Sequence, residues 1–388
     1  MPILLRALLR GKHVTVVHSR LAAVAGALAL GLMAIFFARI GEVAQRAFLS
    51  LLAISPYAPF LVTPLGFAGV VYLTRRLFPA SRGSGIPQVM AASHSPERQA
   101  TGDLLSLKTA CAKFGGTLVM LLVGGSVGRE GPTVQISAAL MVAIHRWQRV
   151  PVTAGVIIAG GAAGVAAAFN TPLAGVAFAI EELAAAFEQK VAVLVMAAVM
   201  ISGLVSLGLA GDYVYFGAMN GNLPFRTLFV VTPIAGILGG VLGGLFSRSL
   251  IAMTHPGQSW LTRARSRPVL LATLCGFVVA LTGWASDGLS WGTGYETTKL
   301  LLNGHSSSMI FGPAKFIATL ATALSGAPGG IFAPSLSVGA GLGQWISQLF
   351  PTNSAGAIVL LGMVGYFTGV VRAPMTAVII MMEMTASG

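Results

Sequence analysis

Charged residues are scarce in this sequence. Only 9% of its 388 residues are Asp, Glu, Lys or Arg, whereas a soluble domain carries about 25%. The mean hydropathy is +0.83. Apolar stretches near or above the roughly 20 residues that cross a bilayer as a helix recur at about 21–37, 104–124, 152–180, 191–210, 228–246, 268–284 and 355–382. The composition therefore excludes a soluble protein and predicts an all-α polytopic membrane protein.

Residues that bind metals or form disulfides are also few. The two cysteines, Cys111 and Cys275, lie in apolar surroundings, and the six histidines are widely separated. This pattern indicates neither a disulfide framework nor a metal site, and the sequence contains no P-loop pattern that would suggest an ATP-driven pump. We expect no cofactor and no metal.

Acidic residues are outnumbered, 11 against 24 Lys and Arg, which gives a formal net charge of +13. The basic residues are scattered among loops, so we interpret them as topology signals and lipid-headgroup contacts, not as a nucleic-acid site. Basic entrances to a pore would favour an anionic substrate. By the positive-inside rule the N-terminus is cytoplasmic, because basic residues precede the first apolar stretch: Arg6, Arg10, Lys12 and Arg20.

The sequence repeats itself. Shifted by 202 positions, the block near 112–181 matches the block near 314–383 without a gap. The matches include Ala112-Lys113-Phe114 with Ala314-Lys315-Phe316, Pro132 with Pro334 and Glu181 with Glu383; a looser match at an offset of 209 pairs Gly83–Ile86 with Gly292–Tyr295. Duplication predicts one transmembrane domain, 1–388, with halves at about 20–210 and 228–388. Many transporters bind substrate at such a repeat interface, between helices broken at Gly and Pro. Hydropathy leaves open whether the repeats are parallel or inverted.

The loop Gly83-Ser84-Gly85-Ile86-Pro87 is the first candidate site. Proline suits the first turn of a helix, and serine is a good cap just before it. Backbone N–H groups and a hydroxyl at the positive end of a helix can hold an anion without a full charge, which lets the ion leave again. The alternative is an ordinary turn.

The loop Gly128-Arg129-Glu130-Gly131-Pro132 places two charges inside apolar sequence. Ionisable residues at membrane depth cost at least about 2.5–3.5 kcal/mol each on insertion scales, so they are functional candidates. We expect Glu130 at a helix N-terminus, where its carboxylate would take the place of an anion and release it when protonated. The alternative is a structural Arg129–Glu130 ion pair.

The repeat counterpart of that loop is Gly329–Pro334, in which Ile331 and Phe332 replace the charged pair and Gly330 and Pro334 remain. Its backbone N–H groups could complete a dehydrated anion cage with the second loop; the alternative is a Gly-rich packing segment. Glu182, next to Glu181, has no counterpart in the other half and suits a proton relay. A carboxylate at the membrane interface is the alternative for Glu182.

Together these loops resemble the anion-site motifs of the CLC chloride channels and transporters. The segments Asn170–Gly175, Arg372–Pro374 and Glu383–Thr385 also resemble that family, over nearly the whole chain from about residue 20. The resemblance implies an inverted repeat of tilted, partly re-entrant helices, and a homodimer with one pore per subunit in the bacterial inner membrane, in contact with lipid. It also implies further helices after Gly388 and a tyrosine there that caps the central ion from inside, to which no residue here corresponds.

The same resemblance implies roles for single residues. Ser84 would supply the central hydroxyl, while Ile331 and Phe332 would supply N–H groups. Glu130 would be the external gate, and Glu182 would pass protons. Ser84 also fits chloride better than the fluoride-exporting branch. The implied activity is chloride/proton exchange, not enzyme catalysis, with a passive chloride channel as the alternative.

A remote alternative is a membrane serine hydrolase. Gly124-Gly125-Ser126-Val127-Gly128 fits the G-x-S-x-G pattern of a nucleophilic serine. However, the strand–turn–helix context is missing, and no His or Asp is evidently placed to activate Ser126.

Overall fold

The computed structural model describes residues 2–96, 102–183, 189–210, 216, 223–253, 266–350 and 354–385. The side chains before Arg20 are not described. Arg6, Arg10 and Lys12, from which the cytoplasmic N-terminus was predicted, therefore lie outside the described side chains. The described part of the chain is helical and holds no strand. Its main helices are α1 (Pro2–Ile54), α2 (Pro59–Leu77), α3 (Ile86–His94), α5 (Leu107–Leu122), α6 (Glu130–Trp147), α7 (Ala154–Phe169), α8 (Pro172–Phe178), α9 (Gln189–Ala210), α10 (Phe225–Ala252), α12 (Pro268–Ala285), α13 (Tyr295–Leu302), α14 (Phe311–Leu324), α15 (Phe332–Leu349), α16 (Ala355–Val371) and α17 (Pro374–Thr385).

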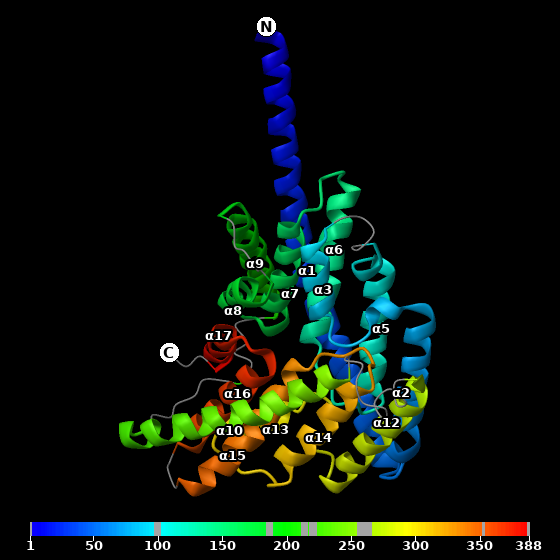
Figure 1. The fold of residues 1–388 in the computed structure, drawn as a ribbon, viewed down its shortest axis with the longest axis vertical. Helices are drawn as coiled ribbons and strands as arrows, with labels where there is room; N and C mark the ends of the chain where they lie inside the picture. The colour runs from blue at the N-terminus through cyan, green and yellow to red at the C-terminus, as the bar shows by residue number, and fades with distance from the viewer. Residues whose placement is uncertain are drawn as a thin grey trace.

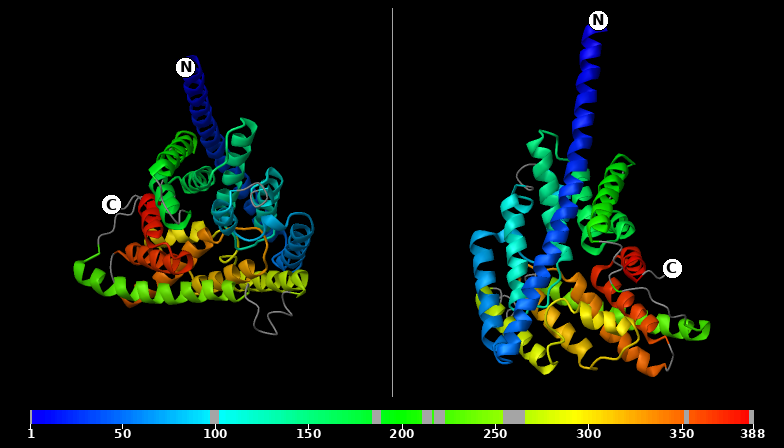
Figure 2. Two further views of the ribbon diagram at one scale, coloured as in Figure 1. Left: turned by 45° about the horizontal axis from the view of Figure 1, so that its top comes forward. Right: turned by 180° about the vertical axis from the view of Figure 1, so that it is seen from behind.

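The two halves of the chain occupy different parts of the molecule (Figure 1). Helices α3 and α5 to α9 lie around the long α1, whereas α10 and α13 to α17 gather below them in that view. Helix α12 packs on α2, which joins the halves at one side. The same separation is visible from two other directions (Figure 2). Equivalent pairs pack alike in both halves, α6 on α7 and α15 on α16.

Five described helical segments are long and apolar enough to cross a membrane: Arg20–Ile54, Gly102–Leu122, Ala192–Leu209, Phe225–Ala252 and Pro268–Ala285. These match five of the seven apolar stretches expected from the sequence. The remaining two stretches, 152–180 and 355–382, are not single spans, because each is divided into two shorter helices.

The two divisions fall at equivalent positions of the repeat. Asn170 ends α7 with φ of 58°, and Arg372 ends α16 with φ of 62°. A left-handed residue stops a helix, and a proline two positions later opens the next one: Pro172 begins α8 and Pro374 begins α17. Continuous hydropathy conceals both breaks, although the Asn-Thr-Pro and Arg-Ala-Pro sequences mark them.

Two carboxylates bind the helices that follow these breaks. Glu181 accepts hydrogen bonds from two backbone N–H groups in the first turn of α17, 2.7 and 3.2 Å long. Glu383, its repeat counterpart, accepts the same pair from the first turn of α8, 2.7 and 3.1 Å long. Each half thus supplies the anionic cap of a helix in the other. Glu181 and Glu383 therefore have a structural role, in which they link α8 and α17.

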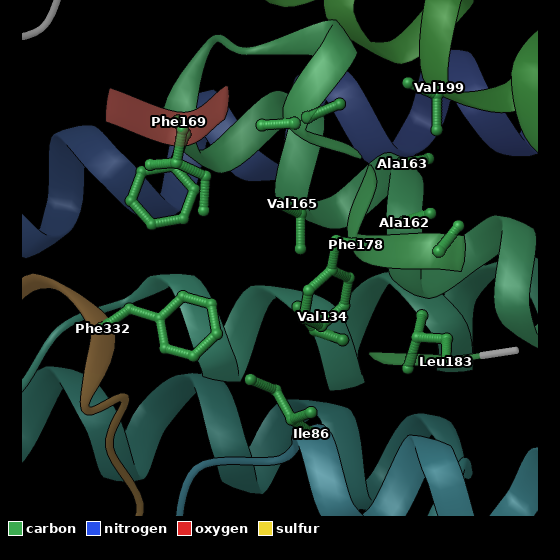
Figure 3. Packing of buried hydrophobic residues seen from close by; sticks show 14 of the residues in the cluster. Ile86, Val134, Ala162, Ala163, Val165, Phe169, Phe178, Leu183, Val199 and Phe332 are labelled. Atoms are coloured by element: carbon green, nitrogen blue, oxygen red, sulfur yellow. The ribbon is translucent and has the colours of Figure 1, made fainter. Parts of the chain in front are cut away.

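The largest hydrophobic cluster crosses the boundary between the halves (Figure 3). Phe332 of α15 lies beside Phe169 and Phe178 of the first half, with ring centroids 6.2 Å away in each case. The ring of Phe367 in α16 packs edge to face against the Phe332 ring, with the ring centroids 4.9 Å apart. This aromatic packing fixes the start of α15 against α7 and α8, at the boundary between the two halves.

Candidate functional site

The second and third predicted loops meet at Gly128 and Gly330. These repeat counterparts form an isolated antiparallel bridge, in which the N–H of each donates to the carbonyl of the other at 2.7 and 2.8 Å. The two backbone segments at this bridge are too close for a side chain at Gly330, because an added methyl would lie 2.9 Å from the Gly128 carbonyl oxygen. The expected convergence of the two loops is therefore present.

The first predicted loop joins the same cluster. The Gly83 carbonyl accepts hydrogen bonds from the Gly329 N–H at 3.2 Å and from the buried Lys113 ammonium at 2.7 Å. A methyl at Gly131 would lie 3.0 Å from the Ser84 carbonyl oxygen, so these backbones are in close contact. All three loops named from the sequence are thus neighbours.

Ser84 does not cap a helix, contrary to the expectation from the sequence. Helix α3 begins at Ile86, and its N-cap is Gly85 with φ of 107° and no side-chain hydrogen bond. Glycine tolerates this backbone conformation at no steric cost, and it moves the cap one residue beyond Ser84. Ser84 instead lines a cavity of about 860 Å³ together with Arg75, Arg82, Gly83, Gly330 and Ile331, among others.

The helices that begin at this point lack side-chain caps. Helix α6 starts at Glu130 and α15 at Phe332, and neither N-cap residue, Arg129 or Ile331, makes a capping side-chain hydrogen bond. The first N–H groups of a helix have no partner within the helix and carry partial positive charge. Pro132 and Pro334 lie in the two first turns, where a missing N–H is tolerated.

Glu130 is fully buried at this junction. Its Oε1 accepts a 2.6 Å hydrogen bond from the Tyr295 hydroxyl, and its Oε2 has no partner among the described residues. A methyl at Gly128 would overlap Oε2 and lie 3.2 Å from the Ala333 backbone nitrogen. The carboxylate therefore lies over Gly128, beside the first turn of α15 as well as at the start of α6.

Arg129 is directed toward α1. Its guanidinium donates to the Ala38 carbonyl at 2.8 Å and lies 3.6 Å from the Glu42 carboxylate. The ion pair that the structure gives to Arg129 is thus with Glu42 and not the Arg129–Glu130 pair considered from the sequence. A partly exposed pair of this kind contributes little to stability, but it holds the loop that precedes Glu130.

Glu182 is partly buried and lies in a single π-helical turn, Ala179–Leu183, that follows α8. Such turns interrupt α-helices and are often found at functional sites. The neighbouring Glu181 is engaged with α17, whereas Glu182 occupies the position that Met384 takes in the other half.

Two buried lysines hold the loops around this junction. Lys113 donates to the Arg82 and Gly83 carbonyls at 3.1 and 2.7 Å. Lys315, its repeat counterpart, donates to the Ser290 and Gly292 carbonyls at 3.0 and 2.6 Å. Both are fully buried, so their ammonium groups bind backbone in place of water.

Tyr295 is the residue that sequence reasoning missed. The loose match between Gly292–Tyr295 and Gly83–Ile86 was the available signal. It aligns Tyr295 with Ile86, however, and gives no indication that a hydroxyl reaches a carboxylate 165 residues away in the chain.

Ser126 is buried beside α14. Its hydroxyl shares a 2.9 Å hydrogen bond with the Thr319 hydroxyl, and its N–H donates to the Thr322 hydroxyl at 3.3 Å. A threonine cannot act as the general base that a hydrolytic serine needs. Across the described residues, no group of three or more His, Cys, Asp or Glu side chains could hold a metal ion.

Comparison with known proteins identifies relatives over nearly the whole chain. The H(+)/Cl(-) exchange transporters ClcA of Yersinia pestis bv. Antiqua (strain Angola) and Yersinia pseudotuberculosis serotype O:3 (strain YPIII) are each 32% identical to it over 395 aligned positions, covering 94% of this chain and 79% of the relative.

Solved structures share the fold at lower identity. A slow cyanobacterial Cl-/H+ antiporter is 24% identical with a TM-score of 0.79, covering 95% of this chain and 89% of that one. A CLC-type fluoride/proton antiporter is 22% identical with a TM-score of 0.79, covering 94% and 89%. The family model described as voltage gated chloride channel matches residues 66–388. The chain is an integral membrane protein and belongs to the voltage-gated chloride channel (CLC) family.

Proposed function

We propose that this protein exchanges chloride for protons across a membrane and that Glu130 is its gate. The observation that carries this proposal is the buried Glu130 carboxylate at the junction where α6 and α15 begin. Uncapped helix N-termini attract anions. A carboxylate in that place competes with a transported anion when it is ionised and stops competing when a proton neutralises it.

The residues around Glu130 can form the rest of the anion path. Ser84 lines the cavity and would supply its hydroxyl, and Ile331 and Phe332 would supply the N–H groups at the start of α15. None of these groups carries a full charge, so an anion can be bound and then released. Arg75 and Arg82 on the cavity wall favour an anion over a cation.

Proton movement requires a second titratable group besides Glu130. Glu182 is proposed for that role because it is partly buried and stands free of the α17 contact that engages Glu181. Ionisable residues at membrane depth serve proton relays in pumps and transporters. The names of the curated relatives, H(+)/Cl(-) exchange transporters, support both the anion and the coupling.

A flux assay in liposomes tests the proposal. In vesicles containing the purified protein, with the membrane potential clamped by a potassium ionophore, chloride entering down its gradient should drive protons out against theirs. Glu130→Ala should leave chloride movement and abolish proton movement. Glu296→Gln, on the exposed face of α13, is the matched control and should keep both.

The outcomes separate the alternatives. Chloride movement without protons in the unaltered protein would favour a passive channel on the same scaffold, and coupling that survives Glu130→Ala would exclude Glu130 as the gate. Fluoride transport in place of chloride transport would overturn the chloride assignment.

We further propose a homodimer in the bacterial inner membrane, surrounded by lipid, with the N-terminus in the cytoplasm. Arg20 at the start of the first span supports that orientation, and the bacterial relatives support the location. Helices α8, α9 and α17 expose large apolar side chains that either a second copy or lipid would cover, such as Leu173, Leu204 and Met375. An N-terminal alkaline phosphatase fusion tests the orientation, and crosslinking in native membranes tests the dimer.

A further inference from the structure

The hydroxyl of Tyr295 contacts the gate directly. It donates a 2.6 Å hydrogen bond to Glu130 Oε1. Because the other oxygen, Oε2, has no partner among the described residues, Tyr295 is the side chain that the structure gives to this carboxylate. A hydrogen bond to a charged acceptor is stronger than one between neutral groups.

The ring of Tyr295 is held in place by its neighbours. It packs against Phe216, with ring centroids 5.8 Å apart and planes inclined at 59°. Phe216 is itself buried, and its N–H donates to the Met384 carbonyl at 2.9 Å. The ring that carries the hydroxyl is therefore packed against a buried neighbour.

The backbone of Tyr295 is fixed as well. It is the first residue of α13, directly after Gly294 with φ of 84°. Thr298 in the same helix donates to the Ser337 hydroxyl of α15 at 2.9 Å, and Ser337 donates to the Thr293 carbonyl at 3.1 Å. The buried Lys315 clamps the preceding carbonyls. Tyr295 is thus anchored to α15, the helix whose N-terminus forms one wall of the site.

The repeat gives this arrangement its asymmetry. In the first half, the loop clamped by Lys113 brings Ser84 to the cavity; in the second half, the equivalent loop clamped by Lys315 brings Tyr295 to Glu130. The first half therefore contributes Ser84 to the cavity lining, and the second half contributes the Tyr295 hydroxyl to the gate.

We propose that Tyr295 is a positioning residue for the gate. Its hydroxyl holds the ionised Glu130 carboxylate in the anion site and so lowers the apparent affinity for chloride, which must displace that carboxylate. The proposal rests on the assignment of Glu130 as the gate. A ligand that binds only the state in which the gate is displaced has an apparent affinity that is reduced in proportion to the fraction of molecules in that state. Removing the hydrogen bond should weaken the competitor and tighten chloride binding.

Chloride titration calorimetry on the purified full chain, at a slightly alkaline pH, measures this competition. Tyr295→Phe keeps the ring and its contact with Phe216 but removes the donor. We expect chloride to bind about tenfold more tightly to Tyr295→Phe than to the unaltered protein, from the usual contribution of a hydrogen bond to a charged group. In a Glu130→Ala background, the same change should alter chloride affinity less than about twofold.

Tyr366→Phe is the matched control. Tyr366 is fully buried and its hydroxyl has no partner among the described residues, so removal of that hydroxyl should leave chloride affinity unchanged. Chloride affinity that is unchanged or weaker in Tyr295→Phe would overturn the proposal, since a weaker affinity would mean that the hydroxyl binds chloride itself. An equal effect with and without Glu130 would also overturn it.

The two assignments fail in different ways. If Glu130→Ala neither tightens chloride binding nor removes proton coupling, the assignment of the gate fails, whatever Tyr295 does. If Glu130→Ala does both and Tyr295→Phe behaves like Tyr366→Phe, the gate stands and the role of Tyr295 is excluded.

Discussion

Gly128 and Gly330 donate backbone hydrogen bonds to each other, although 202 positions separate them in the chain. A reciprocal pair between repeat counterparts places the pseudo-two-fold axis of the molecule between these residues. The backbone is symmetric about this point, but the side chains are not, because Glu130 faces a site whose other half carries Phe332. Substitutions at equivalent positions should therefore have unequal effects on transport.

Gly128→Ala should release the gate. The added methyl would overlap Glu130 Oε2, so the carboxylate must leave the place that it occupies. We expect chloride flux that responds less to pH, together with a loss of stability of about 1–3 kcal/mol from overpacking. Gly69→Ala, in α2 with open space around it, is the control and should change neither chloride flux nor thermal unfolding. Unaltered pH dependence in Gly128→Ala would contradict the position assigned to the carboxylate.

Glu130→Gln should remove the pH dependence of chloride transport. An amide mimics the protonated acid, which no longer competes with the anion as a charge. The unaltered protein should transport chloride faster as the pH falls, because protons neutralise the competing carboxylate, whereas Glu130→Gln should be fast and nearly flat over the same range. Chloride efflux from liposomes at a series of pH values gives the comparison, and a Glu130→Gln profile as steep as the original would count against the gate.

Glu182→Gln should separate proton movement from chloride movement. If Glu182 passes protons, its loss stops proton flux while the anion path through Ser84 and Phe332 remains intact. Simultaneous recording of chloride with an electrode and of protons with a pH probe gives both rates on one vesicle preparation. Proton flux at the original ratio to chloride would refute this role.

Glu181→Gln and Glu383→Gln should both reduce stability without changing coupling. Each removes the negative charge that faces the first turn of a helix from the other half, a contact expected to contribute up to about 2 kcal/mol in a partly buried setting. Thermal unfolding in detergent should show similar losses for the two single variants. The double variant should lose less than their sum, since both loosen the contact between α8 and α17.

The two buried lysines offer a further comparison. Lys113→Met frees the carbonyls beside Ser84, so chloride binding should weaken several-fold. Lys315→Met frees the loop that carries Tyr295 and should not weaken chloride binding. Both should cost about 1–3 kcal/mol of stability, because buried carbonyls lose their donors. Chloride calorimetry with thermal unfolding distinguishes the loops, and equal weakening in the two variants would argue against the division of roles.

Much of the site was predictable because its elements are local. Gly and Pro in Gly128–Pro132 and Gly330–Pro334 mark helix starts by backbone chemistry alone, and the structure begins α6 at Glu130 and α15 at Phe332, at matching positions. The gapless repeat also predicted that the two loops would be neighbours, which the bridge at Gly128 confirms.

What the sequence did not predict depends on packing between distant segments or on one backbone angle. Tyr295 reaches Glu130 only because α13 is fixed against α15. The caps on α8 and α17 come from the opposite half, so no local pattern reveals them. The turn before α3 is capped at Gly85 and not at Ser84, since a positive φ favours glycine over a side-chain cap.

The exchange of caps between Glu181 and Glu383 bears on how the protein is made. Because the first half is synthesised before Glu383, the first N–H groups of α8 lack their carboxylate partner until the second half has been translated. Bare amides are costly in hydrocarbon, which favours keeping α8 near the insertion machinery or near water until the second half arrives. The duplicated architecture thus imposes an order on biogenesis. The halves can be synthesised one after the other, but neither can complete its folding until both are present.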